Sequence, residues 1–341
     1  MAILAFMTAL VAALPQWDFD SQDAPQAWAP NGHLANVSVH DGIVSADATD
    51  WDPSFGCRSF EFAATPWQYV HIRIKANRPG ACDLFWSGEL EGQYGGLTEL
   101  KKQRFQLAGA GEWEDVVLFP FWQREGAIRQ FRLDLFANAH FDIDFVRVGE
   151  WGDGSNGRHK TFVATDFKRI EGAPISWANR LDLAATTAAF ATILATSEVG
   201  GETANLCWSS SERVGMQRAA VPLRAGEHIY NVPLRDSADW CGTISALGLE
   251  LPAGVEVSQL SLGAAPGGGT DVALTYLGFE NGLNRAGRPC RILARFKNFG
   301  GAVAPAFAAA LLLPPGLAFD GSERAQPVRE LKFGESADAA W

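Results

Sequence analysis

The sequence contains few of the residue patterns that usually carry catalysis or metal binding. Its five cysteines (positions 57, 82, 207, 241 and 290) form no C-x-x-C pair and no cysteine–histidine spacing typical of a metal site. Its six histidines are scattered, and the chain has no G-x-S-x-G, no H-E-x-x-H and no glycine-rich phosphate loop. We therefore expect the region to be non-catalytic.

Basic residues are also in the minority. Lys and Arg number 28 against 39 Asp and Glu, a net charge of −11, and they form no cluster. Nucleic acid and anionic membranes are therefore not expected as partners. What the chain has instead is 47% hydrophobic residues with 35 glycines, 17 prolines and 12 tryptophans, which is typical of a turn-rich all-β protein.

Residues 1–13 form an apolar run that ends in small residues and is too short to span a membrane. We interpret it as a signal peptide cleaved after Ala13, although no Lys or Arg precedes it. The protein is then secreted, periplasmic or at the cell surface, with no membrane insertion after signal removal. A buried first strand is the alternative.

The cysteines admit two interpretations in an exported protein. Cys57 with Cys82, and Cys207 with Cys241, could each form a disulfide within one domain, leaving Cys290 over. The alternative is that they are small buried apolar residues. The sequence leaves the pairing open.

Strict alternation marks several strands. In the run from Tyr69 to Lys75, the apolar residues Val70, Ile72 and Ile74 are expected to face a core, with His71, Arg73 and Lys75 facing out. Two further apolar-rich runs, 131–136 and 141–149, are separated by a short loop and predict closing strands of an antiparallel sandwich.

Landmarks of this region return later in the same order, which indicates an internal repeat. Trp28 returns as Trp177 at an offset of 149, Trp86 as Trp208 at 122, Trp122 as Trp240 at 118, and Gly149 as Gly263 at 114. The falling offset means that the second copy is shorter, by about two strands. The paired Leu84/Trp86 and Leu206/Trp208 predict core positions, because residues two apart share a sheet face.

These patterns divide the chain into a signal peptide, two sandwiches, two linkers and a third segment. The predicted boundaries are 1–13 for the signal peptide, 14–151 and 161–263 for the sandwiches, 152–160 and 264–270 for the linkers, and 271–341 for the third segment. The first linker, rich in Gly and Ser, is expected to be flexible.

The first copy resembles the galactose-binding-like jelly-roll domains, or carbohydrate-binding modules, of secreted bacterial polysaccharide-active proteins. The resemblance rests on these residues: Phe19-Asp20, Trp28, Asp41 to Val44, Asp52-Pro53, Leu84 to Trp86, Trp122, Arg132 to Asp134 and Ile143 to Val146. It implies two tandem antiparallel jelly-roll β-sandwiches and polysaccharide as the partner.

Aromatic side chains in loops are the natural platforms for sugar rings. We predict that Trp51, Trp67, Tyr94 and Trp113 bind carbohydrate, with His71 and Arg73 supplying hydrogen bonds. For each, packing on the sandwich or a plain solvated face is the alternative. The second copy has no counterpart of Trp51, Trp67 or Tyr94 and is expected to be a spacer.

The same resemblance implies a structural Ca²⁺ near the first and last strands of the first copy. Asp18, Asp20, Asp142 and Asp144 are the candidate ligands, because Ca²⁺ prefers oxygen donors. Ordinary surface carboxylates are the alternative, and no other cofactor is expected.

The third segment resembles bacterial immunoglobulin-like modules associated with adhesion and glycosidases. The resemblance rests on Asn298-Phe299-Gly300, Pro315-Gly316-Leu317 and Gly334-Glu335-Ser336. Such sandwiches need roughly 100 residues, so we expect an incomplete immunoglobulin-like domain.

The sequence as a whole predicts a secreted, non-catalytic carbohydrate-binding or targeting region. The first alternative is a cell-surface or adhesion scaffold with no glycan site. The second is the N-terminal fragment of a glycoside hydrolase or related enzyme whose catalytic domain lies beyond residue 341.

Overall fold

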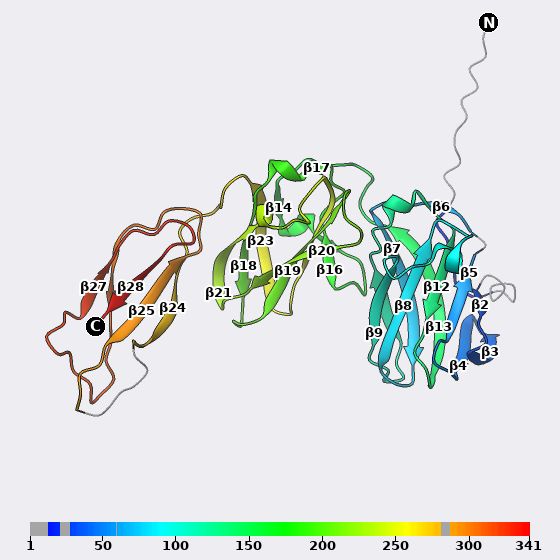
Figure 1. The fold of residues 1–341 in the computed structure, drawn as a ribbon, viewed down its shortest axis with the longest axis horizontal. Coiled ribbons are helices and arrows are strands. Elements are labelled where there is room, and N and C mark those ends of the chain that lie inside the picture. Colours follow the sequence, from blue (N-terminus) through cyan, green and yellow to red (C-terminus); the bar gives the residue numbers. More distant parts are fainter. Residues whose placement is uncertain (1–12, 21–27, 59, 281–286) are drawn as a thin grey trace, which may run out of the picture.

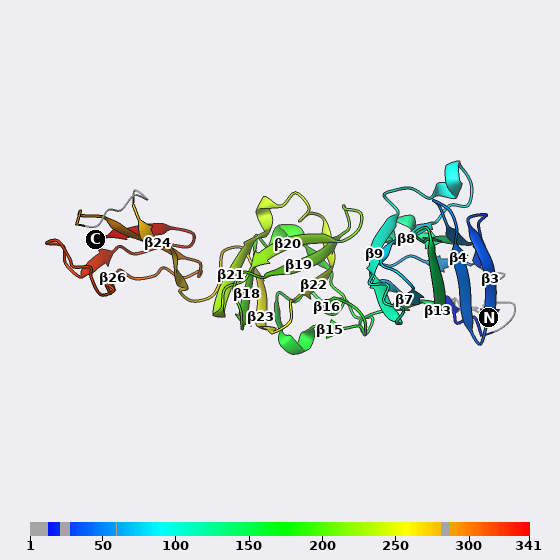
Figure 2. The same ribbon diagram turned by 90° about the horizontal axis from the view of Figure 1, so that it is seen from below.

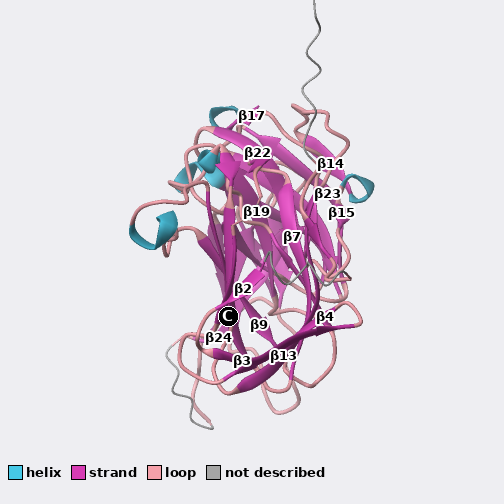
Figure 3. Cartoon of the chain, turned by 90° about the vertical axis from the view of Figure 1, so that its right-hand side faces the viewer, coloured by secondary structure: helices cyan, strands magenta, loops and turns pink. Residues whose placement is uncertain are grey.

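A computed structural model describes residues 13–20, 28–58, 60–280 and 287–341. The predicted signal peptide lies outside the described residues except for Ala13. The described chain is all-β and antiparallel, as predicted, and its only helical segments are short 3₁₀ turns (Figure 3). It forms three units in a row, with the third unit at the opposite end from the first (Figures 1 and 2).

The first unit is a sandwich of two sheets, with a small ribbon at one end. One sheet has the order β10 (Glu114–Leu118), β7 (Gln68–Ala76), β13 (Ala139–Glu150), β4 (Ile43–Ala48), β3 (Leu34–His40), and β1 (Gln16–Trp17) lies along β13. The other has the order β2 (Trp28–Pro30), β5 (Ser54–Cys57), β12 (Gln130–Asp134), β8 (Gly80–Ser87), β9 (Lys102–Leu107). The ribbon pairs β6 (Phe62–Ala63) with β11 (Ala127–Ile128).

The core of this sandwich follows from alternation. Val70, Ile72 and Ile74 on β7 have no exposed surface, as the sequence predicted, and face inward-pointing residues of β8 and β12. Trp86 and Trp122 are also buried, and their rings meet edge to face at 5.9 Å. They are packing residues, as predicted.

The second unit is also a sandwich of two sheets. One sheet has the order β14 (Thr161–Val163), β23 (Val255–Gly263), β18 (Phe190–Ser197), β21 (Gly226–Pro233). The other has the order β15 (Lys168–Arg169), β16 (Ile175–Trp177), β22 (Thr243–Glu250), β19 (Thr203–Ser210), β20 (Gln217–Pro222), with β17 (Leu183–Ala184) beside β22. The 3₁₀ turns are η2 (Gln93–Gly96), η3 (Gln123–Glu125), η4 (Ala164–Asp166), η5 (Ala185–Thr187) and η6 (Leu234–Asp236).

Two local features recur at corresponding places. Trp208 and Trp240 are buried and meet edge to face at 5.5 Å, as Trp86 and Trp122 do. The ladder between β13 and β7 has a bulge between Ile143 and Phe145, and the ladder between β23 and β18 has one opposite Leu194 and Ala195. Each sandwich therefore contains an edge-to-face tryptophan pair and a bulged strand.

An apolar cluster joins the two sandwiches. Phe119 and Phe121, which follow β10, pack edge to face on Trp177 of β16 at 5.2 and 5.3 Å. Trp151 stacks on Trp177 at 5.4 Å and is 7% exposed. Gly157 forms a bridge with Leu181, so the segment after Trp151 runs against the second sandwich. Trp151, which precedes the predicted linker 152–160, is therefore buried between the sandwiches, whereas most of residues 152–160 are exposed.

The third unit has two separate small sheets. One has the order β24 (Val272–Phe279), β25 (Ile292–Asn298), β28 (Ser336–Ala340), and the other pairs β26 (Phe307–Ala310) with β27 (Ala325–Val328). Its buried core is small: Ala304, Ala309, Val328, Leu331 and Ala339.

The cysteines are not bridged in the predicted pairs. Cys82 and Cys207 are buried thiols, and Cys241 and Cys290 are thiols at partly or fully exposed positions. Burial raises the pKa of Cys82 and of Cys207 to about 12. The alternative interpretation, small buried apolar residues, fits Cys82 and Cys207.

Candidate functional site

The outer face of the sheet that contains β12 carries a row of charged side chains. Because Leu84, Phe131 and Leu133 point into the core, their neighbours along β8 and β12 point out. We call the outward set the β12 face; it consists of Asp83, Phe85, Lys102, Arg104, Arg132 and Asp134. The strand register places Arg132 beside Phe85 and Asp134 beside Asp83.

Two groups of ion pairs hold these side chains in place. Arg132 donates two hydrogen bonds to Asp134, at 2.6 and 2.9 Å, and one to Asp52 at 3.0 Å. Arg104 donates two to Asp83, at 3.0 and 2.8 Å, and Lys102 lies 3.2 Å from the same carboxylate. Bidentate pairs of this kind fix both partners in orientation, so the face presents polar groups in a set arrangement.

An aromatic ring lies between the two groups. Phe85 is 8% exposed, with the Lys102 ammonium 5.2 Å and the Arg132 guanidinium 5.6 Å from its ring centroid. Both cations therefore rest on an apolar floor, where cation–π attraction adds to the ion pairs.

The two central carboxyl groups, Asp134 and Asp83, have pKa values shifted in opposite directions. Burial raises the pKa of Asp134 to about 6, against the opposing effect of the Arg132 hydrogen bonds. Burial also acts on Asp83, but hydrogen bonds from Arg104 and Lys102 outweigh it and hold the pKa of that carboxyl below its ordinary value. As the pH falls toward 6, Asp134 therefore takes up a proton before Asp83 does.

Two exposed aromatic residues stand at opposite ends of the β12 face. Trp51, 78% exposed, precedes β5 at the end where Ser54 pairs with Asp134. Tyr94, 71% exposed, follows β8 at the end where Ser87 pairs with Gln130. The four residue-to-residue steps from Asp83 to Ser87 span roughly 14 Å at about 3.4 Å per step. The two rings therefore flank a face long enough for an extended ligand.

The loop that carries Tyr94 has an unusual backbone. Gly92, Tyr94, Gly95 and Gly96 all have positive φ. For Tyr94 this conformation is strained, and it persists because the surroundings fix it. The buried Gln130 side chain donates hydrogen bonds to the carbonyl groups of Glu89 and Gly95. The sheet thus holds the loop from below.

Three further predicted residues lie together on the opposite face of the sandwich. His71, Arg73 and Trp113 point outward from the sheet that contains β7. Arg73 lies 5.7 Å from the Trp113 ring centroid and 3.7 Å from Asp115, and the His71 Nε2 atom lies 2.8 Å from the Asp115 Oδ1 atom. We call this the β7 face.

Trp67 is not a loop platform. Its ring nitrogen donates a hydrogen bond of 2.9 Å to the Ser245 carbonyl of the second sandwich, and the Arg180 guanidinium lies 4.8 Å from its ring centroid. Trp67 therefore belongs to the contact between the sandwiches, and the prediction that it binds sugar from an open loop is wrong.

The four predicted calcium ligands do not come together. Asp18 pairs with Arg147, Asp142 with Lys75, and Asp144 with Arg73. The Asp20 carboxylate lies instead against Gly42. No group of three or more His, Cys, Asp or Glu side chains in the described part of the chain could hold a metal ion. These residues do not fit the predicted calcium site.

The corresponding face of the second sandwich is covered. In the strand register, Leu247 lies opposite Trp208 in the second sandwich, as Phe131 lies opposite Trp86 in the first. One position further on, Gly248 corresponds to Arg132, and Cys207 corresponds to Phe85. A side chain on Gly248 would collide with the Trp177 ring, which itself packs on Phe119 and Phe121 of the first sandwich. Only the first sandwich leaves this face open.

The sequence indicated which residues of β8 and β12 point outward, but it did not indicate that these residues form a candidate binding site. Arg132, Asp134 and Phe85 belong to the residues that carry the family resemblance, but they were not predicted as site residues. The outward positions on both sides of the buried Leu84 and Leu133 were the available signal.

No protein-family model matches the sequence, and no curated protein matches it. Among solved structures, the chain is similar to one described as "CBM4 structure and function", at 15% identity and a TM-score of 0.27, over 40% of this chain and 85% of that chain. A family 29 carbohydrate-binding module complexed with cellulohexaose matches at 9% identity and 0.31, over 41% of this chain and 93% of that one.

A third match is the glycoside hydrolase domain of Endo-D from Streptococcus pneumoniae, at 10% identity and 0.27, over 69% of this chain and 37% of that one. All three TM-scores are below 0.5, so the fold and the site rest on the geometry above. In the described residues no helix has the length and apolar character to cross a membrane.

Proposed function

We propose that the first sandwich binds a polysaccharide chain across its β12 face. The observation that carries this proposal is the combination on one open sheet face of fixed ion pairs with exposed aromatic rings at both ends. Sugar rings stack their C–H groups on aromatic faces, and their hydroxyl groups bond to polar side chains held in place. Trp51 and Tyr94 supply the stacking, while Asp83, Arg104, Arg132 and Asp134 supply the hydrogen bonds.

The role of the region in this proposal is binding and not catalysis. Each charged group of the β12 face is engaged in an ion pair that orients it, which suits recognition of hydroxyl groups. The second sandwich acts as a spacer, because its corresponding face packs against the first. Export through residues 1–13 is part of the proposal; N-terminal sequencing of the protein recovered outside the cell should begin at Leu14, and retention of Met1 in that protein would contradict it.

The test is affinity electrophoresis of the full chain in gels that contain soluble neutral or acidic polysaccharides, followed by calorimetric titration with any that retards it. Trp51→Ala and Tyr94→Ala should each weaken binding about tenfold or more, as expected for exposed aromatic anchors. Both side chains are exposed, so the melting temperature should barely change.

Matched controls separate this face from the others. Trp113→Ala removes an aromatic ring from the β7 face, and Val214→Ala removes an apolar side chain that is 50% exposed in the second sandwich. Neither should alter affinity. Loss of binding in Trp113→Ala with full binding in Trp51→Ala would move the site to the β7 face. Failure of every polysaccharide to retard the wild type would refute glycan binding and favour the scaffold.

A further inference from the structure

The second sandwich has an unpaired strand border at the point where β14 ends. Only residues 259–261 of β23 pair with β14, because β14 stops at Val163 and the chain then turns into η4. Residues 255–257 of β23 pair with β18 on one side, and no strand of the described chain pairs with them on the other. We call these three residues the β23 edge.

The border at the same place in the first sandwich is occupied. The ladder between β13 and β7 bulges at Asp144, and the three residues before the bulge, 141–143, pair with β4 on their other side. The ladder between β23 and β18 bulges at Ser258, so the β23 edge is the corresponding set of three residues. Val44 and Ala46 of β4 point into the first sandwich and are buried. A strand therefore fits at such a border, and the bulge does not prevent it from pairing.

The backbone of the β23 edge presents hydrogen-bonding groups to this open side. The Gly254 carbonyl accepts a hydrogen bond from the Glu198 amide, so Gly254 and Glu256 turn their backbone groups toward β18. The alternate residues Val255 and Val257 turn theirs the other way. In the part of the chain that the structure describes, no partner engages the backbone groups of these two valines on that side. They form a template on which a further strand can pair.

An apolar groove lies beside the β23 edge. It has a volume of about 460 Å³, and its lining includes Phe167, Leu249, Leu251 and Val257. Phe167 and Leu251 pack on the core of the second sandwich but remain partly exposed. Apolar side chains on one face of an added strand would cover them, as the inward face of β4 covers the core of the first sandwich.

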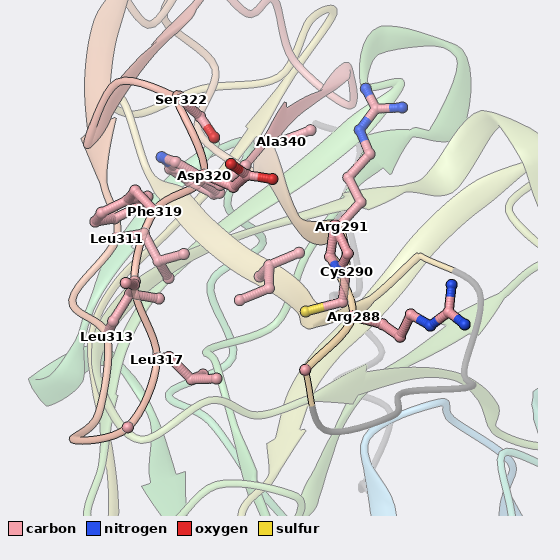
Figure 4. Close-up of a pocket in the computed structure, with 16 residues that line it drawn as sticks. Arg288, Cys290, Arg291, Leu311, Leu313, Leu317, Phe319, Asp320, Ser322 and Ala340 are labelled. Carbon is pink, nitrogen blue, oxygen red and sulfur yellow. The ribbon is translucent and has the colours of Figure 1, made fainter.

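The walls of this groove come from residues 164–258, far from both ends of the sequence. The third unit contacts the opposite border of the same sheet, where the Asp271 carboxylate accepts hydrogen bonds from Arg224 and from the Ile229 amide of β21 (Figure 1). A larger hollow, of about 750 Å³, lies within the third unit, and its wall includes Trp341, the last residue of the sequence (Figure 4). The groove beside the β23 edge is therefore the better defined docking surface.

We propose that the β23 edge binds an extended peptide segment of a partner protein, which adds to the sheet as an antiparallel strand. The segment resembles β4: it has small or medium apolar residues at every second position, with a hydroxyl group between them. In the first sandwich the Ser45 hydroxyl donates a hydrogen bond of 2.5 Å to Asp142, and Glu256 is the corresponding residue of the β23 edge. Main-chain hydrogen bonds supply the affinity and the alternate side chains the specificity. The second sandwich then has a binding role beyond that of a spacer.

The test uses the full chain and a fluorescent peptide with the sequence of residues 42–49, without glycan, so it is independent of the proposed function. The fluorescence anisotropy of the peptide should rise as the chain is added, and hydrogen–deuterium exchange of residues 255–258 should slow. The Ala46→Pro peptide is the control. It lacks an amide that faces the partner strand, so it should bind about tenfold more weakly.

A variant of the chain tests the groove. Ala164→Lys places a long charged side chain at an exposed position of the groove lining and should weaken peptide binding about tenfold or more, with little change in melting temperature. The matched control is Ala225→Lys, at an exposed turn residue before β21, which should bind the peptide as the wild type does.

Four results would overturn the proposal. They are no rise in anisotropy, equal binding of the Ala46→Pro peptide, unchanged binding by Ala164→Lys, and protection by the peptide at β13 in place of residues 255–258. Slower exchange of residues 255–258 on concentrating the chain without peptide would assign the edge to a second copy, and it would also overturn the proposal.

Discussion

Replacing Phe119 with alanine should uncouple the two sandwiches. Phe119 follows β10 of the first sandwich and is 3% exposed, with ring centroids 5.5 Å from Trp151 and 5.2 Å from Trp177. Truncating a buried phenylalanine costs about 3–5 kcal/mol when the surroundings cannot collapse into the space. Because Phe119 lies outside the core cluster of its own sandwich, this loss falls on the contact between the units.

Differential scanning calorimetry is the assay. An apolar interface of this kind couples domains, so the two wild-type sandwiches should melt in one transition. In Phe119→Ala that transition should separate into two. Phe105→Ala is the control, since Phe105 is 8% exposed within the first sandwich's own core, and it should lower the melting temperature without separating the transitions. An unsplit transition in Phe119→Ala would refute the assignment of the cluster as a coupling contact.

Three further outcomes are expected. Cys290 is exposed and should react with iodoacetamide in the native protein, whereas Cys82, whose pKa burial raises to about 12, should be labelled only after denaturation; equal labelling in peptide mass spectra would be inconsistent with the fold. Burial acts to raise the pKa of Asp271, but hydrogen bonds from Arg224 and neighbours lower it overall, so the ionised carboxylate stabilises the fold above pH about 4 and this stabilisation is lost below that pH. Asp271→Asn should therefore remove the rise in limited proteolysis of the third unit that occurs on acidification. An unchanged rise would assign it to another titrating group. Gln130→Leu should speed amide exchange in residues 88–96 while β12 stays protected, and unaltered exchange would show that Gln130 does not hold the loop.

The local sequence pattern was sufficient to predict which side chains are buried within a single sandwich. The alternation of Val70, Ile72 and Ile74 specified an inward face, and the spacing of Leu84 and Trp86 specified core positions. Both predictions are confirmed, because a strand with one buried face admits only one register relative to its own core.

Pattern failed where one unit covers another. Trp67 looked like a loop aromatic because it follows a proline, yet its ring lies against the second sandwich. Trp151 ends the predicted first sandwich, and its neighbours in the sequence gave no sign that it is buried against Trp177 of the second sandwich. The two-residue alternation of a strand shows to which face of its own sheet a side chain points. It carries no information about which other unit packs against that face.

The sequence by itself determined the all-β class, the strands of the first sandwich and the tryptophans of its core, because alternation and turn residues act over a few neighbouring positions. The tertiary structure decided which outward face stays open. It placed Arg132, Asp83 and their partners, distant in the chain, on one surface between Trp51 and Tyr94. It also closed the matching face of the second sandwich, because packing Phe119 and Phe121 against Trp177 removes apolar surface from water, a gain that exists only once the two units meet.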